Sequence, residues 1–339
     1  MTATKMKMPA LLGLVRFKDW WNYKIPSILA MAYLLPAYTG YGGTKVLCSI
    51  FLLLVYFVLG ASFASVVNDL TDIRSDRLAG KSNMMARLST SQRFGLLLAV
   101  TVLAALFCNR ILPTGTAILL ALTNYLAFVL YSVRPFRLKD RGIWGVLVVA
   151  LGESMLPSVF SLYFMGVMLQ VDVIGPLYLL VALCSWCYGI RAILWHQYQD
   201  KASDAYANTG TLVLALSDRS LKRVQYILFV LECISCLLLL CWLNLVAVYC
   251  FLALYLFFLY IRKFRYKHSL VYAISAKGSA HSILLFDFYQ FFLPVALLLS
   301  VTFAGQYGYL LLLAHLVLFH RPLWVVGRDF WHYFRYLWG

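Results

Sequence analysis

Three aspartates stand at one end of a long apolar run, in the segment NDLTDIRSDRLAGKSN at residues 68–83. The residues before it, FLLLVYFVLGASFASVV, carry no charge. Asp69, Asp72 and Asp76 are three and four residues apart, so on a helix they would share one face. Carboxylates crowded in this way repel one another and resist leaving water. The spacing therefore predicts that a cation binds among them.

A second segment, WHQYQDKASD at residues 195–204, repeats this pattern at an offset of 128 from VNDLTDIRSD at 67–76. The offset pairs Asn68, Asp69, Asp72 and Asp76 with His196, Gln197, Asp200 and Asp204, respectively. The match predicts two related four-helix units whose acidic ends face each other across a central cavity. Internal duplication is also common in transporters, so the repeat alone does not name the function.

The acidic residues favour Mg²⁺ as the bound cation, because they offer hard oxygen ligands with few soft ligands nearby. Mg²⁺ usually keeps some waters and takes one or two carboxylates together with substrate phosphates. A single DxxxD is more often a solvated helix end, but two at matched places argue for a site. The predicted metal ligands are Asp69, Asp72, Asp76, Asp200 and Asp204.

Basic residues follow in YSVRPFRLKDRG at 131–142, on the same predicted side of the membrane. Arg137 and Lys139 are the best candidates there to hold phosphate oxygens. The alternative is that the loop is basic only because loops on this side usually are. Asp140 is expected to pair with a neighbouring base. The full set of predicted phosphate-binding residues is Asn68, Lys81, Arg137, Lys139, Arg191 and Gln197.

The elements that must position these residues are membrane helices. The chain has 339 residues, of which 63% are hydrophobic and 12% are charged, whereas a soluble domain carries about 25% charged residues. Several apolar stretches reach the length needed to cross a bilayer. The predicted spans are 25–42, 45–68, 92–109, 113–132, 143–166, 172–197, 222–241, 244–261 and 283–303, with a possible short tenth at 307–320.

The net charge of +16 follows the same topology. Basic residues gather in alternate loops at 74–93, 134–141, 201–223 and 262–277, and the opposite loops carry little beyond Lys45 and Arg110. This positive-inside pattern predicts a cytoplasmic N-terminus and cytoplasmic acidic motifs. It argues against a nucleic-acid partner and leaves anionic lipids and anionic substrates as partners.

Several polar residues lie inside or at the ends of predicted spans, where ionisable groups are functional candidates by default. Glu153 could orient an acceptor or take a proton, and a neutral structural role is the alternative. Arg191 needs an anionic partner, either a diphosphate or an aspartate. His196 could be a base or a phosphate contact. Glu232 and Asp287 are candidates on the same grounds as Glu153, with Asp287 favoured, and Asn22 and Lys24 are weaker candidates.

These motifs resemble those of the UbiA superfamily of intramembrane prenyltransferases. NDLTDIRSD matches that family's NDxxDxxxD signature, and DKASD matches its second DxxxD, with Thr211 where a threonine often follows. YSVRPFRLKDRG is similar to the family's short connector. RFKDWWNYKIP at 16–26 resembles its basic and aromatic opening.

The resemblance implies an all-α fold with nine membrane helices around a central cavity that opens sideways to lipid. It implies Mg²⁺ as cofactor, an isoprenyl diphosphate donor and a lipophilic or aromatic acceptor, joined through an allylic carbocation. The implied catalytic residues are Asp69, Asp72, Asp76, Asp200, Asp204 and His196. The single domain would contain one unit at 16–132, a second at 143–261 and further helices at 283–339.

Alternatives remain open at this point. A terpene cyclase or a transferase of phosphoribosyl groups to polyprenyl phosphate would use the same site. A non-enzymatic membrane carrier built on a duplicated bundle would not need the Asn68–Asp69 pair. The motifs do not distinguish transfer from cyclisation, and they give neither the acceptor nor the donor chain length.

Overall fold

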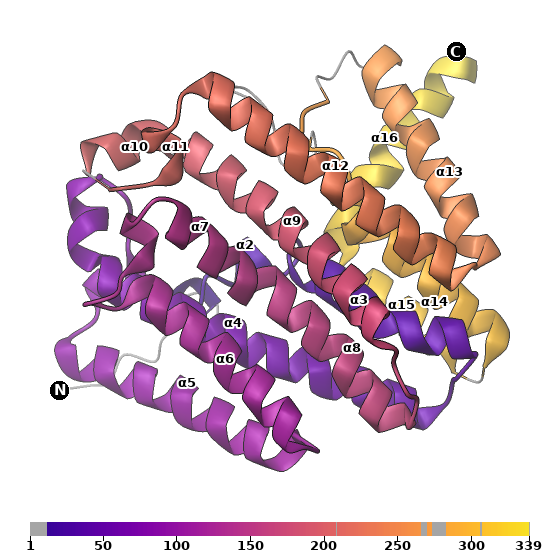
Figure 1. Cartoon of the computed structure of the whole chain (residues 1–339), viewed down its shortest axis with the longest axis horizontal. Coiled ribbons are helices and arrows are strands. Elements are labelled where there is room, and N and C mark those ends of the chain that lie inside the picture. The colour runs from indigo at the N-terminus through magenta and orange to yellow at the C-terminus, as the bar shows by residue number, and fades with distance from the viewer. Residues whose placement is uncertain (1–11, 208, 266–269, 273–282, 306, 339) are drawn as a thin grey trace.

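The computed structural model describes residues 12–207, 209–265, 270–272, 283–305 and 307–338, and helices dominate it (Figure 1). The described residues contain no β-strand, only two isolated bridges, Gly142–Thr211 and Val271–Ile283. The predicted all-α class is therefore confirmed. Lys267 and Lys277, from the fourth basic loop, lie outside the described residues.

The helices follow one another with short connections. The first part of the chain forms α2 (Phe17–Trp20), α3 (Ile25–Thr39), α4 (Thr44–Leu78), η1 (Met84–Arg87), α5 (Thr90–Ile111), α6 (Gly115–Ser132) and η2 (Leu138–Asp140). The middle forms α7 (Ile143–Ala150), η3 (Leu151–Met155), α8 (Leu156–Leu169), α9 (Gly175–Gln199), α10 (Lys201–Tyr206), α11 (Leu212–Ala215) and α12 (Asp218–Leu243). The last part forms α13 (Val246–Tyr260), η4 (Ile261–Arg265), η6 (Phe288–Phe292), α14 (Leu293–Ala304), α15 (Gly308–Leu318) and α16 (His320–Trp338).

Seven helices within the described residues are long and apolar enough to cross a membrane. They are Thr44–Leu78, Thr90–Ile111, Gly115–Ser132, Ile143–Leu169, Gly175–Gln199, Asp218–Leu243 and Val246–Phe264. The chain is thus a multi-pass membrane protein. The count of nine spans stays a prediction, because Ile25–Thr39 and Phe288–Ala304 are apolar but shorter. The predicted tenth span corresponds to α15, which meets α16 at a bend of 82°.

Local sequence signals set several helix boundaries. Ser89, Thr114 and Ser217 cap α5, α6 and α12, and each side chain accepts a hydrogen bond from a backbone N–H of the first turn. These bonds satisfy amide groups that a helix start otherwise leaves without partners. Gly40 ends α3 at a φ of 70°, a left-handed conformation that glycine adopts at little cost.

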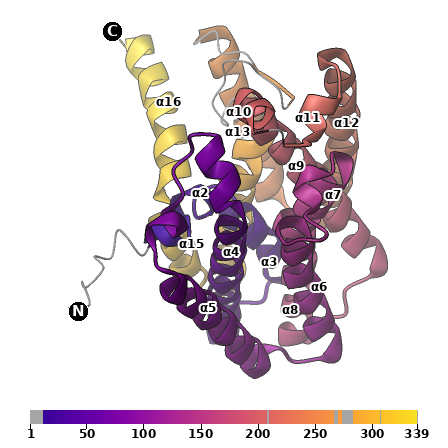
Figure 2. The same cartoon turned by 90° about the vertical axis from the view of Figure 1, so that its left-hand side faces the viewer.

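Helix α3 lies at the centre of the bundle, where it packs against α4, α8, α14 and η6. The remaining helices surround it, and α9 packs against both α7 and α12. In the view from the end that carries α10 and α11, α5 lies on the outside against α4 (Figure 2). This arrangement brings the ends of α4 and α9 to one side of the molecule (Figure 1). The two predicted four-helix units remain a prediction.

Candidate active site

The first acidic motif occupies the last turns of α4. This helix has 35 residues and therefore extends about 50 Å, whereas a bilayer core is about 30 Å thick. Asp69, Asp72 and Asp76 all lie in this one helix, as the spacing predicts. The length of α4 lets the carboxylates stand beyond the apolar part of the same helix.

The basic connector folds back onto the middle aspartate of this motif. Lys139 Nζ lies 2.5 Å from Asp72 Oδ1 and donates to Asn68 Oδ1 at 3.0 Å. Arg137 Nη2 donates to the same Asp72 oxygen at 2.9 Å, and its Nε donates to Asp140 Oδ2 at 2.6 Å. The predicted pairing of Asp140 with a neighbouring base is confirmed. Burial lowers the pKa of Lys139, and Asp72 opposes this effect.

Lys81 connects the two acidic motifs. It follows α4 closely in the chain, yet its Nζ lies 2.7 Å from Asp200 Oδ2 and 3.8 Å from Asp204 Oδ1. Burial raises the pKa of Asp204, while the charge of Lys81 lowers it and that of Asp200 raises it. Since Lys81 N also donates to the carbonyl oxygen of Asp76 at 2.8 Å, this residue connects the end of the first motif to the carboxylates of the second.

The second motif is not a continuous helix, in contrast to the first. Helix α9 ends at Gln199, and Asp200 forms a turn before α10. A helical hydrogen bond from Asp204 N to Asp200 O, at 2.8 Å, still keeps the two aspartates one turn apart. His196 is 60% exposed, and its Nδ1 lies 3.7 Å from Asp200 Oδ2. Gln197 is buried, and its Oε1 has no hydrogen-bond partner among the described residues.

A close backbone contact holds the connector against the second motif. Gly142 N donates to Gly210 O at 2.8 Å, and Gly142 also forms a bridge with Thr211. A Cβ atom on Gly210 would lie 2.3 Å from the carbonyl oxygen of Asp140. Only glycine therefore allows this approach without moving one of the two backbones.

Two residues that the sequence did not predict complete the site. Arg16 Nη1 lies 3.5 Å from Asp69 Oδ1, and its Nε lies 3.1 Å from Asp19. Asn83 Nδ2 donates to Asp76 Oδ2 at 2.7 Å and to the carbonyl oxygen of Asp69 at 2.9 Å. Arg16 belongs to the basic opening and Asn83 to the stretch 68–83, and both segments were singled out from the sequence. The sequence pattern of these segments did not predict the two contacts.

Comparison with known proteins assigns the chain to a family. A family profile described as the UbiA prenyltransferase family matches residues 25–271, well over half of the chain. The chain belongs to the UbiA prenyltransferase family. No curated protein sequence matches it.

Solved structures share the fold at low sequence identity. A UbiA homolog from Archaeoglobus fulgidus bound to GPP and Mg²⁺ has a TM-score of 0.61 and 16% identity, covering 86% of this chain and 99% of that one. The same homolog bound to DMAPP and Mg²⁺ has a TM-score of 0.56 and 16% identity, covering 86% and 98%. A structure of digeranylgeranylglyceryl phosphate synthase in membranes has a TM-score of 0.56 and 17% identity, covering 88% and 98%.

The acidic residues of this UbiA family member fit Mg²⁺ in type. The part of the chain that the structure describes has no group of three His, Cys, Asp or Glu side chains placed to hold a metal ion. Mg²⁺ does not require such a group when substrate phosphates supply the other ligands. The buried Oε1 of Gln197 and Oδ1 of Asp140 are further oxygens with no partner among the described residues.

The structure places Arg191 away from the two motifs. Its Nη1 lies 2.6 Å from Glu232 Oε2, and both side chains are fully buried. Its Nε and Nη2 donate to the carbonyl oxygens of Tyr272 and Leu284, each at 2.7 Å. The anionic partner of Arg191 in the structure is thus Glu232. We leave Arg191 out of the proposed site.

Two of the other candidates, Asp287 and Glu153, also form ion pairs inside the protein. Asp287 is buried and pairs with Arg262. Glu153 pairs with Lys24, at 2.6 Å between Oε2 and Nζ. Asn22 has an Oδ1 that is buried and lacks a partner among the described residues. None of these contacts involves the aspartates of the two motifs.

Proposed function

We propose that this protein transfers an isoprenyl group from a prenyl diphosphate to a lipophilic or aromatic acceptor, in a reaction that requires Mg²⁺ and passes through an allylic carbocation. The observation that carries the proposal is the contact of Lys81 with both aspartates of the second motif. Through it, two acidic segments that are more than a hundred residues apart meet at one end of the bundle. Membership of the UbiA family and the relatives solved with GPP or DMAPP support the donor class.

Each group of residues has a role in this proposal. The proposed Mg²⁺ ligands are Asp69, Asp72, Asp76, Asp200 and Asp204, with His196 beside them. The proposed diphosphate contacts are Asn68, Lys81, Arg137, Lys139 and Gln197. Bound Mg²⁺ would neutralise negative charge on the departing diphosphate. The excess of Lys and Arg in the loops at this end supports a cytoplasmic location for it and for the N-terminus.

Replacement of an aspartate in each motif tests the proposal. We expect Asp72→Ala and Asp200→Ala each to reduce diphosphate release from GPP to below about 1% of the wild-type rate, because charge stabilisation of the leaving group is lost. The measurement uses purified full-length protein in detergent with Mg²⁺ and labelled GPP. Asp218→Asn is the matched control, because Asp218 is 61% exposed and pairs only with Lys201 among the described ion pairs.

The products of the wild-type protein distinguish the reaction classes. Diphosphate release that needs a phenol or a long-chain alcohol supports transfer. Release without any acceptor, with a cyclic product, would replace transfer by cyclisation. Full activity in either alanine variant would remove the site assignment, and no release from GPP or DMAPP would contradict the proposed function.

A further inference from the structure

Glu153 lies in the one turn of its span that departs from α-helical geometry. The span Ile143–Leu169 contains a π-helical turn, η3, at Leu151–Met155. The carbonyl oxygen of Gly152 in this turn accepts a hydrogen bond from Asn124 Nδ2 of α6 at 2.7 Å. Turns of this kind inside α-helices are rare and occur frequently at functional sites.

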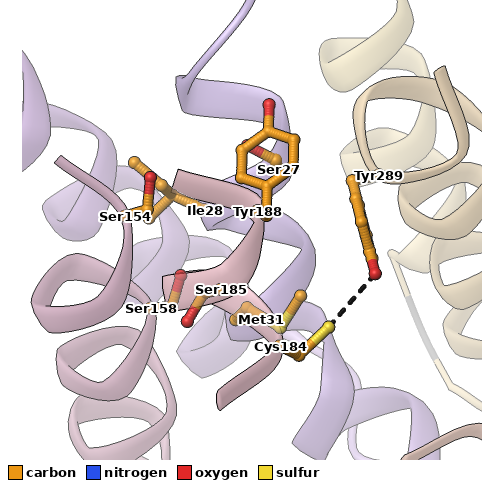
Figure 3. Close-up of a pocket in the computed structure, with 9 residues that line it drawn as sticks. All are labelled: Ser27, Ile28, Met31, Ser154, Ser158, Cys184, Ser185, Tyr188 and Tyr289. Atoms are coloured by element: carbon orange, nitrogen blue, oxygen red, sulfur yellow. Dashed lines mark hydrogen bonds between the residues drawn. The ribbon is translucent and has the colours of Figure 1, made fainter. Parts of the chain in front are cut away.

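The side chain of Glu153 contacts the start of the central helix. Its partner Lys24 directly precedes α3, the central helix. The neighbouring residues Ser154 and Ser27 line one pocket between η3, α3 and α9 (Figure 3). This pocket has a volume of about 10 Å³, which is enough for roughly one water molecule. It is too small for a prenyl group, so it is not the space that would hold the donor.

The Lys24–Glu153 pair remains accessible, in contrast to another ion pair of the interior. The side chains of Arg191 and Glu232 are both 0% exposed. Those of Lys24 and Glu153 are 38% and 32% exposed. A carboxylate well inside a membrane span that keeps a third of its surface open can contact a ligand.

Helix α6 links the turn that holds Glu153 to the basic connector. It packs against both η3 and η2, and Tyr131 lies near its end. Lys139 lies 5.9 Å from the centre of the Tyr131 ring. The same helix therefore contacts the turn that holds Glu153 and the connector lysine of the proposed diphosphate site.

We propose that Glu153 is the base that removes the acceptor's proton, a role that rests on the proposed function. The bond between the isoprenyl carbon and the diphosphate oxygen breaks, and the diphosphate keeps the electron pair. The acceptor's oxygen or ring carbon then bonds to that isoprenyl carbon, and its O–H or C–H proton passes to Glu153. The acceptor class is thus a lipophilic phenol, alcohol or arene that carries hydrogen on its nucleophilic atom. Lys24 positions the carboxylate until the acceptor arrives.

Substitutions of the pair separate proton transfer from structural support. With labelled GPP, Mg²⁺ and a panel of lipophilic phenols and long-chain alcohols, we expect Glu153→Gln to lower formation of prenylated product by about 100-fold or more, with GPP binding changed less than about twofold. Glu153→Asp should recover part of the activity, since it restores a carboxylate. Lys24→Met should lose less activity than Glu153→Gln, and the double variant should stay as inactive as Glu153→Gln.

Three outcomes would overturn the assignment. Glu153→Gln activity close to wild type would show that no proton passes to Glu153. Wild-type activity in the double variant would show that the Lys24–Glu153 pair has no role in proton transfer. A wild-type protein that prenylates no acceptor would contradict the proposed transfer itself. This result differs from a failure of the Glu153 assignment, because it is seen in the unsubstituted protein.

Discussion

At the level of single residues, each aspartate of the two motifs has a polar partner. Arg16 pairs with Asp69, Lys139 and Arg137 pair with Asp72, and Asn83 binds Asp76. Lys81 forms ion pairs with Asp200 and Asp204. The crowding of carboxylates that the sequence presents is thus relieved by cations from three other segments. A diphosphate bound here would meet the same cations, so they are placed to exchange carboxylate oxygens for phosphate oxygens.

Lys81 is the most direct test of this exchange. We expect Lys81→Met to raise the KM for GPP by about tenfold, because a hydrogen bond to a charged group is worth roughly 1.5–3 kcal/mol. The turnover number should fall less, since the aspartates remain. Steady-state kinetics at fixed Mg²⁺ gives both values. Lys201→Met is the matched control, since Lys201 pairs with Asp218, and an unchanged KM in Lys81→Met would exclude a diphosphate contact.

Sequence reasoning singled out most of the residues that the structure brings together here, but not all of them. The aspartates were predictable because their helical spacing indicates a cation site. Lys139 and Arg137 were predictable because they are basic residues in the connector on the same side. The contact of Arg16 with Asp69 was not predictable, since it depends on how the segment before α3 folds back to α4. The partner of Arg191 was missed for a similar reason: Glu232 is 41 residues further along the chain, on a different helix.

At the level of elements, the site depends on two segments that meet through their backbones. The connector at 138–142 and the segment at 209–211 touch at Gly142 and Gly210. Helical periodicity predicts where α4 and α9 run. It does not predict this contact, because neither segment has a periodic pattern and the contact is formed by main-chain atoms.

Gly210→Ala tests the importance of this contact. The added methyl group would force the two backbones apart, which typically costs about 1–3 kcal/mol. We expect a lower melting temperature in detergent and a raised KM for GPP, since Lys139 and Arg137 move with the connector. Gly95→Ala is the matched control, because nothing lies within 4 Å of a Cβ atom there. Equal behaviour of the two variants would show that the contact is not needed.

At the level of the whole molecule, a fully buried ion pair connects distant helices. Arg191 of α9 binds Glu232 of α12, and it also holds the carbonyl oxygens of Tyr272 and Leu284. The rings of Phe229 and Phe286 lie 5.0 and 5.6 Å from its guanidinium carbon. The pair thus ties α9 and α12 to the segment that precedes η6.

Removal of one partner should destabilise the fold strongly. We expect Arg191→Met to cost about 3–5 kcal/mol, because it leaves an uncompensated buried carboxylate. The double variant Arg191→Met with Glu232→Met should recover much of this loss, since no lone charge remains. Thermal unfolding in detergent measures both. A single variant as stable as wild type would show that the pair contributes little to the fold.

The attachment of α16 has a practical consequence for where this protein can be shortened. Arg262 lies within the matched family region, yet it pairs with Asp287 and with Asp329 of α16, both beyond that region. Its guanidinium also stacks on Phe258, at 4.1 Å from the ring centre. A version trimmed to residues 25–271 would keep this cation and discard both carboxylates. Expression work on this protein should therefore retain the C-terminal helix, although it lies outside the conserved profile.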